Sequence, residues 1–179
     1  AGVDIGRHRD LTVFWVVQRE DDQLVTRGVW EAEQIAFREQ AERLHALLRL
    51  PTLRSCAIDA GGIGMPLAEE AVELFGSAKV MPVTFTSKIK DELATGLRLH
   101  VEEGTLRIPV DESIRNDWHS IKRTVATAGP SRYEAGRSGL GHGDRFWAGC
   151  LAVKASGQQT GKSEVMRGQP LRFSRMRIW

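Results

Sequence analysis

Residues 2–17 read Gly-Val-Asp-Ile-Gly-Arg-His-Arg-Asp-Leu-Thr-Val-Phe-Trp-Val-Val, and this stretch decides the expected fold. Its two apolar runs, Val3–Gly6 and Leu11–Val17, are joined by the polar stretch Arg7–Asp10. Runs of β-branched and aromatic residues separated in this way are typical of a β-hairpin. A third such run, Leu24–Trp30, follows an acidic turn. We therefore expect three consecutive antiparallel strands, a meander, at the start of the chain.

The rest of the chain alternates between strand-like and helix-like patterns. Phe37, Ala41, Leu44 and Leu48 fall on one face of a helix. The further expected elements are a strand at Leu53–Ile58, a helix that includes Pro66 and stops at Gly76, a strand at Val80–Val83, a helix capped by Ser87 and ending at Gly104, a small strand at Leu106–Ile108, a helix at Asp111–Ile121, a hairpin of Thr124–Ala128 and Arg132–Ala135, and a helix from Asp144 to about Ala155. This order predicts an α/β fold with a mixed central sheet covered by helices.

Length and composition indicate one globular domain. A chain of 179 residues with 41% hydrophobic and 27% charged residues is neither disordered nor fibrous. No apolar run approaches the roughly 20 residues that cross a bilayer, so we expect no membrane partner. Basic residues outnumber acidic ones five to one in residues 157–179. We therefore expect a domain at residues 1–156, followed by a basic tail or linker at 157–179. Because the first residue is Ala1 and not Met, we also expect that the chain was cut from a longer polypeptide.

Three acids stand out by their surroundings. Asp4 lies inside an apolar strand, and Asp59 ends another strand before Ala-Gly-Gly. Asp144 starts an apolar helix, in Gly-His-Gly-Asp-Arg-Phe-Trp-Ala. A carboxylate in or beside a core is costly unless its charge is compensated. Local roles remain open for two of them, because Asp144 could cap a helix and Asp59 could cap a turn. Asp4 has no lysine or arginine placed by sequence to pair with it.

A shared metal site would explain all three acids. Carboxylate oxygens favour hard cations such as Mg²⁺ or Mn²⁺. Two such ions can act together on the attacking and leaving oxygens of a phosphodiester. The spacing of the acids along the chain carries no geometric information, so the fold must bring them together.

Five segments of the chain carry a family resemblance. They are Val3-Asp4-Ile5-Gly6, Ile-Asp-Ala-Gly-Gly-Ile-Gly at 58–64, Leu-Ala-Glu-Glu at 67–70, Gly-Thr-Leu-Arg-Ile-Pro at 104–109 and, most specific, His-Gly-Asp-Arg-Phe-Trp-Ala at 142–148. From Gly2 to about Ala155 the chain resembles the C-terminal nuclease domain of the large terminase subunit of tailed bacteriophages. That domain cuts concatemeric DNA during genome packaging.

The resemblance implies an RNase H-like fold, with helices on both faces of the sheet, and a metal-dependent endonuclease. Asp4, Asp59 and Asp144 would be the catalytic, metal-binding triad for two Mg²⁺ or Mn²⁺ ions, with Asp4 bridging both. The substrate would be double-stranded DNA. We expect cleavage with little sequence preference, because nothing in the chain looks like a helix that reads bases. The resemblance also implies an upstream packaging ATPase domain, portal and small terminase subunit as partners, and a location in the cytoplasm of the bacterial host.

Four further residues are candidates for supporting roles. His142 could assist beside the metals or contact the substrate, although a role in stabilising its turn is an equal alternative. Lys88, Arg137 and Arg145 are candidates for DNA-phosphate contacts, with an ordinary surface position as the alternative for each.

Other functions fit parts of the same pattern. Asp4-Ile5-Gly6 with Thr12, together with the Asp59 loop, is similar to the phosphate loops of actin-like and sugar-kinase-like ATPases. Those proteins normally need two such subdomains, for which this chain is short. A resolvase or transposase core would keep the fold and change the substrate, and a DNA- or portal-docking module would lack activity. The intact set of acids favours the nuclease.

Overall fold

The computed structural model describes residues 1–6, 10–124, 132–135 and 143–157. Within these residues the strands are β1 (Gly2–Asp4), β2 (Leu11–Glu20), β3 (Gln23–Glu33), β4 (Cys56–Asp59), β5 (Val80–Val83), β6 (Leu106–Arg107), β7 (Ile121–Thr124) and β8 (Arg132–Ala135). The helices are α1 (Phe37–Leu48), α2 (Gly64–Phe75), α3 (Ser87–Glu102), α4 (Glu112–Ser120) and α5 (Asp144–Ser156). The expected basic tail lies outside the described residues, apart from Gly157.

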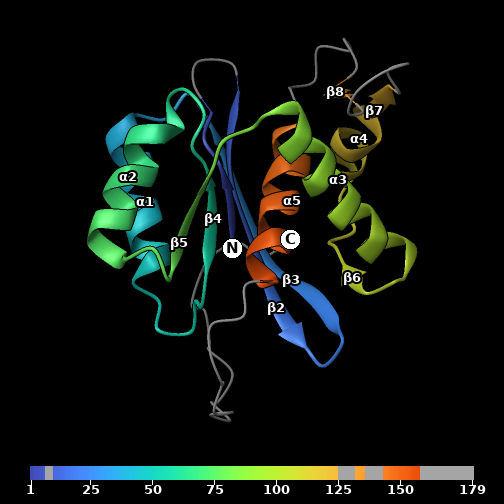
Figure 1. Cartoon of the computed structure of the whole chain (residues 1–179), viewed down its shortest axis with the longest axis horizontal. Helices are drawn as coiled ribbons and strands as arrows, with labels where there is room; N and C mark the ends of the chain where they lie inside the picture. The colour runs from blue at the N-terminus through green and yellow to red at the C-terminus, as the bar shows by residue number, and fades with distance from the viewer. Residues whose placement is uncertain (7–9, 125–131, 136–142, 158–179) are drawn as a thin grey trace.

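A mixed six-stranded sheet forms the centre of the domain, in the order β5-β4-β1-β2-β3-β6 (Figure 1). Strands β1, β2 and β3 are antiparallel neighbours, which confirms the expected meander. Parallel pairs join β1 to β4, β4 to β5 and β3 to β6. A separate antiparallel pair, β7 and β8, lies beside α4 at the periphery.

Helices cover both faces of the sheet, as Figure 1 shows, with α1 and α2 on one side and α3 and α5 on the other. The alternation of side chains along each strand divides the core between these two layers. Val3, Phe14 and Ile58 belong to the cluster that packs with α1 and α2. Leu24 and Ala57 are buried with α3 and α5 on the opposite face. The predicted α/β class and two-sided architecture are therefore confirmed.

Most expected elements occur, with shifts that have local causes. The cap of α3 is Thr86, whose side chain accepts a hydrogen bond from the Ile89 N–H, so the prediction of Ser87 was wrong by one residue. Strand β7 begins at Ile121, directly after α4 ends, and not at Thr124 as predicted. Within the described residues, no helix is both long and apolar enough to cross a membrane.

A backbone contact fixes α5 against β1. A Cβ atom at Gly2 would lie 2.1 Å from the Ala148 backbone oxygen and 2.2 Å from the Ala152 backbone nitrogen. Residue 2 must therefore be glycine for the strand and the helix to approach this closely. The contact brings the strand that carries Asp4 directly beside the helix that carries Asp144.

Candidate metal centre

Two of the predicted acids occupy neighbouring places in one row across the sheet. Asp4 pairs with Val13 of β2, and Val13 pairs in turn with Glu31 of β3. In the parallel β1–β4 register, Val3 is level with Ile58, so Asp4 is level with Asp59. Residues at the same level of adjacent strands project to the same face of a sheet. The carboxylates of Asp59, Asp4 and Glu31 therefore share the face that α5 covers.

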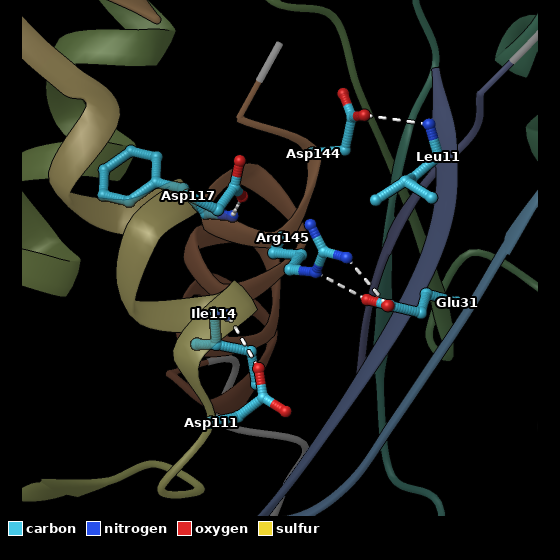
Figure 2. Close-up of polar contacts among 8 residues, drawn as sticks. Leu11, Glu31, Asp111, Ile114, Asp117, Asp144 and Arg145 are labelled. Atoms are coloured by element: carbon cyan, nitrogen blue, oxygen red, sulfur yellow. Dashed lines mark hydrogen bonds and ion pairs between the residues drawn. The ribbon is translucent and has the colours of Figure 1, made fainter. Parts of the chain in front are cut away.

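The third acid reaches this row from the first turn of α5. One Asp144 carboxylate oxygen, Oδ2, accepts a hydrogen bond of 2.9 Å from the Leu11 N–H at the start of β2 (Figure 2). The alternative that Asp144 caps its own helix is wrong, because the N-cap is Gly143 and has no side chain to contribute. The carboxylate is instead held against the sheet, two residues along β2 from the partner of Asp4.

Asp4 is a buried acid beside other acids. It is only 8% exposed, and among the described residues no hydrogen-bond donor or cationic group lies within bonding distance of its carboxylate. Burial raises its pKa well above the usual range, and the negative charges of Asp144 and Asp59 raise this pKa further. The three predicted acids are thus close enough to interact electrostatically, and Asp4 lies between the other two.

Asp59 has both the predicted local role and a place at the same site. Its Oδ1 accepts a hydrogen bond of 2.8 Å from the Gly61 N–H, so the carboxylate does cap the turn after β4. Burial raises the pKa of Asp59, while the Gly61 N–H and the charge of Lys90 oppose this increase. The second carboxylate oxygen remains for another ligand, because one oxygen is sufficient for the turn.

The carboxylate ligands suit hard divalent cations, although they are not yet arranged as a complete coordination site. Among the described residues, no three histidine, cysteine or acidic side chains are already arranged as a metal-binding group. Like charges at one site repel, so carboxylates without a counter-cation are not expected to close around a common point. The oxygen-only ligands and the buried Asp4 nevertheless fit hard divalent cations better than softer metals.

The candidate phosphate contacts have different surroundings. Lys88 is 81% exposed at its side chain and lies 3.9 Å from Glu92 one turn along α3. Arg145 points away from Asp144 and forms a two-pronged ion pair with Glu31, at 2.6 and 2.7 Å (Figure 2). Arg137 and His142 lie outside the described residues, and so do their predicted roles.

Sequence reasoning missed Lys90 and Asp10, two charged residues at the site. Lys90 Nζ lies 4.8 Å from the Trp147 ring centre and 5.4 Å from that of Phe85, and its charge acts on both Asp4 and Asp59. The charge of Asp10 contributes to the raised pKa of Asp4. A signal for Asp10 existed, because it directly precedes the strand that pairs with Asp4. No signal existed for Lys90, since its ring partner Trp147 is on another helix.

The whole domain, and not only its acids, is similar to known proteins. Residues 1–155 match the family model of the terminase RNase H-like domain. The chain is 34% identical over 159 residues to the Mu-like prophage FluMu protein gp28 of Haemophilus influenzae, covering 87% of this chain and 31% of that protein. It is 30% identical over 162 residues to the probable terminase large subunit gp28 of Escherichia phage Mu, covering 87% and 29% respectively. The chain thus spans about a third of the length of these curated relatives.

The same fold occurs in solved structures. The large terminase nuclease from thermophilic phage G20c with bound magnesium superposes with a TM-score of 0.70 at 24% identity, covering 86% of this chain and 78% of that one. The nuclease domain of the Thermus phage P74-26 large terminase gives a TM-score of 0.63 at 20% identity, covering 90% and 82%. These likenesses support the RNase H-like fold expected from the sequence.

Proposed function

Because the chain belongs to the terminase RNase H-like domain family, which it matches over residues 1–155, we propose that it is a metal-dependent endonuclease. Its substrate would be the double-stranded DNA concatemer that is cut during phage genome packaging. The observation that carries the proposal is the row of acids on one sheet face, with the buried Asp4 between Asp59 and Asp144 and without a cationic partner in bonding distance among the described residues.

We assign the metal ligands by their positions. Asp4, in the middle, would bind both of two divalent cations, while Asp59 and Asp144 would each complete one site. When bound, such a pair of cations supplies Lewis acidity that activates a water and stabilises the departing 3′ oxygen. The chain orients the ligands through backbone donors, with Gly61 holding one oxygen of Asp59 and Leu11 holding one oxygen of Asp144.

Lys90 is the basic residue that we propose for the phosphate beside these acids. Its ammonium group is held over Phe85, which follows β5, and over Trp147, one turn after Asp144 on α5. A cation at this place attracts the phosphodiester towards the carboxylates, which alone would repel it. Lys88 and Arg137 remain proposals for phosphate contacts farther along the DNA.

The partners and location follow from the same proposal. Magnesium, cobalt and zinc are each bound in structures of the phage G20c nuclease, which supports a divalent cation here and leaves the choice of Mg²⁺ or Mn²⁺ as our proposal. An upstream packaging ATPase domain, portal and small terminase subunit would be partners of the longer protein. It would act in the cytoplasm of the bacterial host.

The test is cleavage of supercoiled plasmid by the purified chain with Mn²⁺, with Mg²⁺ and with EDTA. We expect cleavage only in the presence of Mn²⁺ or Mg²⁺, and none in EDTA. The variants Asp4→Asn, Asp59→Asn and Asp144→Asn should lose cleavage while they retain the wild-type circular dichroism spectrum. Asp22→Asn, in the exposed β2–β3 turn, is the matched control and should cut normally. Undiminished cleavage by a variant that carries all three substitutions refutes the assignment, and ATP binding without cleavage supports the actin-like alternative.

A further inference from the structure

The first turn of α5 is capped by a residue of another helix. Four backbone N–H groups at a helix start lack partners within the helix, and Gly143, the N-cap of α5, has no side chain to satisfy one. Asp117 of α4 provides the acceptor instead, because its Oδ2 accepts a hydrogen bond of 3.1 Å from the Phe146 N–H. Asp117 is only 5% exposed, so this contact between α4 and α5 lies inside the protein.

The next residue of the same turn is fixed to the sheet. Both prongs of the Arg145 guanidinium contact the Glu31 carboxylate, and the Arg145 side chain is only 13% exposed. Paired, charge-assisted hydrogen bonds of this kind fix direction as well as distance. Glu31 stands in the same row of the sheet as Asp4, with Val13 between them. The ion pair therefore fixes α5 to the row that holds the candidate ligands.

We propose that Glu31, Arg145 and Asp117 are positioning residues, which hold the start of α5 so that Asp144 presents its carboxylate to the metals. This inference rests on the proposed function, because it takes Asp144 to be a metal ligand. Figure 2 shows that the two adjacent residues make different contacts, with Asp144 turned towards Leu11 and Arg145 turned towards Glu31. Consecutive side chains at the beginning of a helix project in different directions, so the two contacts are compatible.

The rival role for Arg145 is a direct contact with a DNA phosphate. The two roles make opposite predictions for Glu31→Gln. If Arg145 binds phosphate, this substitution releases the guanidinium, removes a repelling charge and strengthens DNA binding. If Arg145 positions α5, the substitution loosens the helix start and weakens metal binding without improving DNA binding.

The experiment measures Mn²⁺ affinity by titration calorimetry, DNA affinity in EDTA, melting temperature, and the kcat and KM of plasmid cleavage. Glu31→Gln should weaken Mn²⁺ binding roughly 10-fold or more and lower kcat, as is typical when a residue that orients a metal ligand is lost. The KM for DNA should stay the same. Arg145→Lys keeps the positive charge but cannot form the paired hydrogen bonds of a guanidinium with Glu31, so it should also weaken Mn²⁺ binding and lower kcat. Glu20→Gln, which breaks the exposed Glu20–Arg27 ion pair of the same hairpin, is the control and should change none of these quantities.

Three results would overturn the inference. Wild-type Mn²⁺ affinity in both Glu31→Gln and Arg145→Lys would show that the ion pair does not orient a ligand. Tighter DNA binding by Glu31→Gln would assign Arg145 to phosphate. A lower melting temperature with unchanged Mn²⁺ affinity would reduce the pair to a structural role. Asp144→Asn distinguishes a failure of this inference from a failure of the proposed metal site. If Asp144→Asn binds Mn²⁺ like the wild type, the proposed assignment of Asp144 as a metal ligand fails. If Asp144→Asn loses Mn²⁺ binding while Glu31→Gln and Arg145→Lys keep it, only the positioning role fails.

Discussion

Replacing Asp4 with asparagine should stabilise the metal-free domain while abolishing cleavage. The Asp4 carboxylate is buried, and its pKa is raised first by burial and then by the charges of Asp144 and Asp59. A raised pKa means that the folded state binds more protons than the unfolded state. The stability of the metal-free wild type should therefore fall as the pH rises from about 4, the pKa of an unfolded aspartate, through the pKa of folded Asp4. Asp4→Asn should lack this part of the pH dependence.

The size of the effect follows from the surroundings of Asp4. Leaving a buried polar group without a partner costs roughly 1–3 kcal/mol, and more for a charged one. An asparagine amide removes the charge and can donate hydrogen bonds to the neighbouring carboxylates. In a domain of this size, 1 kcal/mol corresponds to about 2–4 °C in melting temperature. We therefore expect Asp4→Asn to melt about 5 °C above the wild type near pH 7.5 in EDTA.

Thermal unfolding with and without Mn²⁺ is the assay. An ion present at about 100 times its Kd stabilises the folded state by about 2.7 kcal/mol, so Mn²⁺ should raise the melting temperature of the wild type. Mn²⁺ should raise the melting temperature of Asp4→Asn much less, so the difference in melting temperature between this variant and the wild type should shrink or disappear. Asp22→Asn, on the exposed turn, should behave as wild type in both buffers. A lower melting temperature of Asp4→Asn in EDTA would refute the electrostatic reasoning.

Two further predictions concern Lys90 and the turn after Asp59. Lys90→Gln should reduce DNA cleavage about 10-fold or more without weakening Mn²⁺ binding, since it removes a cation that attracts phosphate and repels metal. Arg98→Gln on the same helix is the control in both assays. Undiminished cleavage by Lys90→Gln would contradict the assignment. A Cβ atom at Gly64 would lie 2.1 Å from the Asp59 backbone oxygen, so Gly64→Ala should destabilise the domain by about 1–3 kcal/mol in urea unfolding and impair cleavage. By contrast, a Cβ at Gly96 meets nothing within 4 Å, so Gly96→Ala should stabilise helix α3 by about 0.5–1 kcal/mol. A Gly64→Ala variant that unfolds at the same urea concentration as the wild type, or at a higher one, would refute this reasoning.

Local patterns were sufficient for much of the fold. The spacing of the apolar residues predicted α1, because burial of one helix face imposes that period, and Leu44 and Leu48 are buried on this face. Phe37, which the pattern placed on the same face, is 46% exposed at the start of the helix. Strands β2 and β3 were predicted too short, because each extends into mostly polar residues, Gln18–Glu20 in β2 and Glu31–Glu33 in β3. These residues pair with the apolar runs of the neighbouring strand, as Arg19 does with Leu24 and Glu31 with Val13, and an apolar pattern along one strand does not reveal such pairing. Thr86 and Ser87 are both good caps, so the sequence alone could not decide between them.

The candidate site was only partly predictable. The apolar flanks of Asp4, Asp59 and Asp144 singled out these acids, and the family resemblance proposed a common role for them. The order of the strands and the approach of α5 are long-range features, which no local spacing contains. For the same reason, no local pattern predicted that Arg145 would pair with Glu31, 114 positions away. The assignment of the three acids as metal ligands remains a prediction.

The contact at Gly2 makes the separation of β1 and α5 a property of the main chain, because no side chain stands between them at that point. Substitutions elsewhere in the core that conserve volume should leave this distance unchanged. The surrounding core should therefore tolerate redesign for heat resistance with the geometry of the acids preserved. A redesign that places any side chain at residue 2 would have to move the backbone of α5 away from β1, and Asp144 with it.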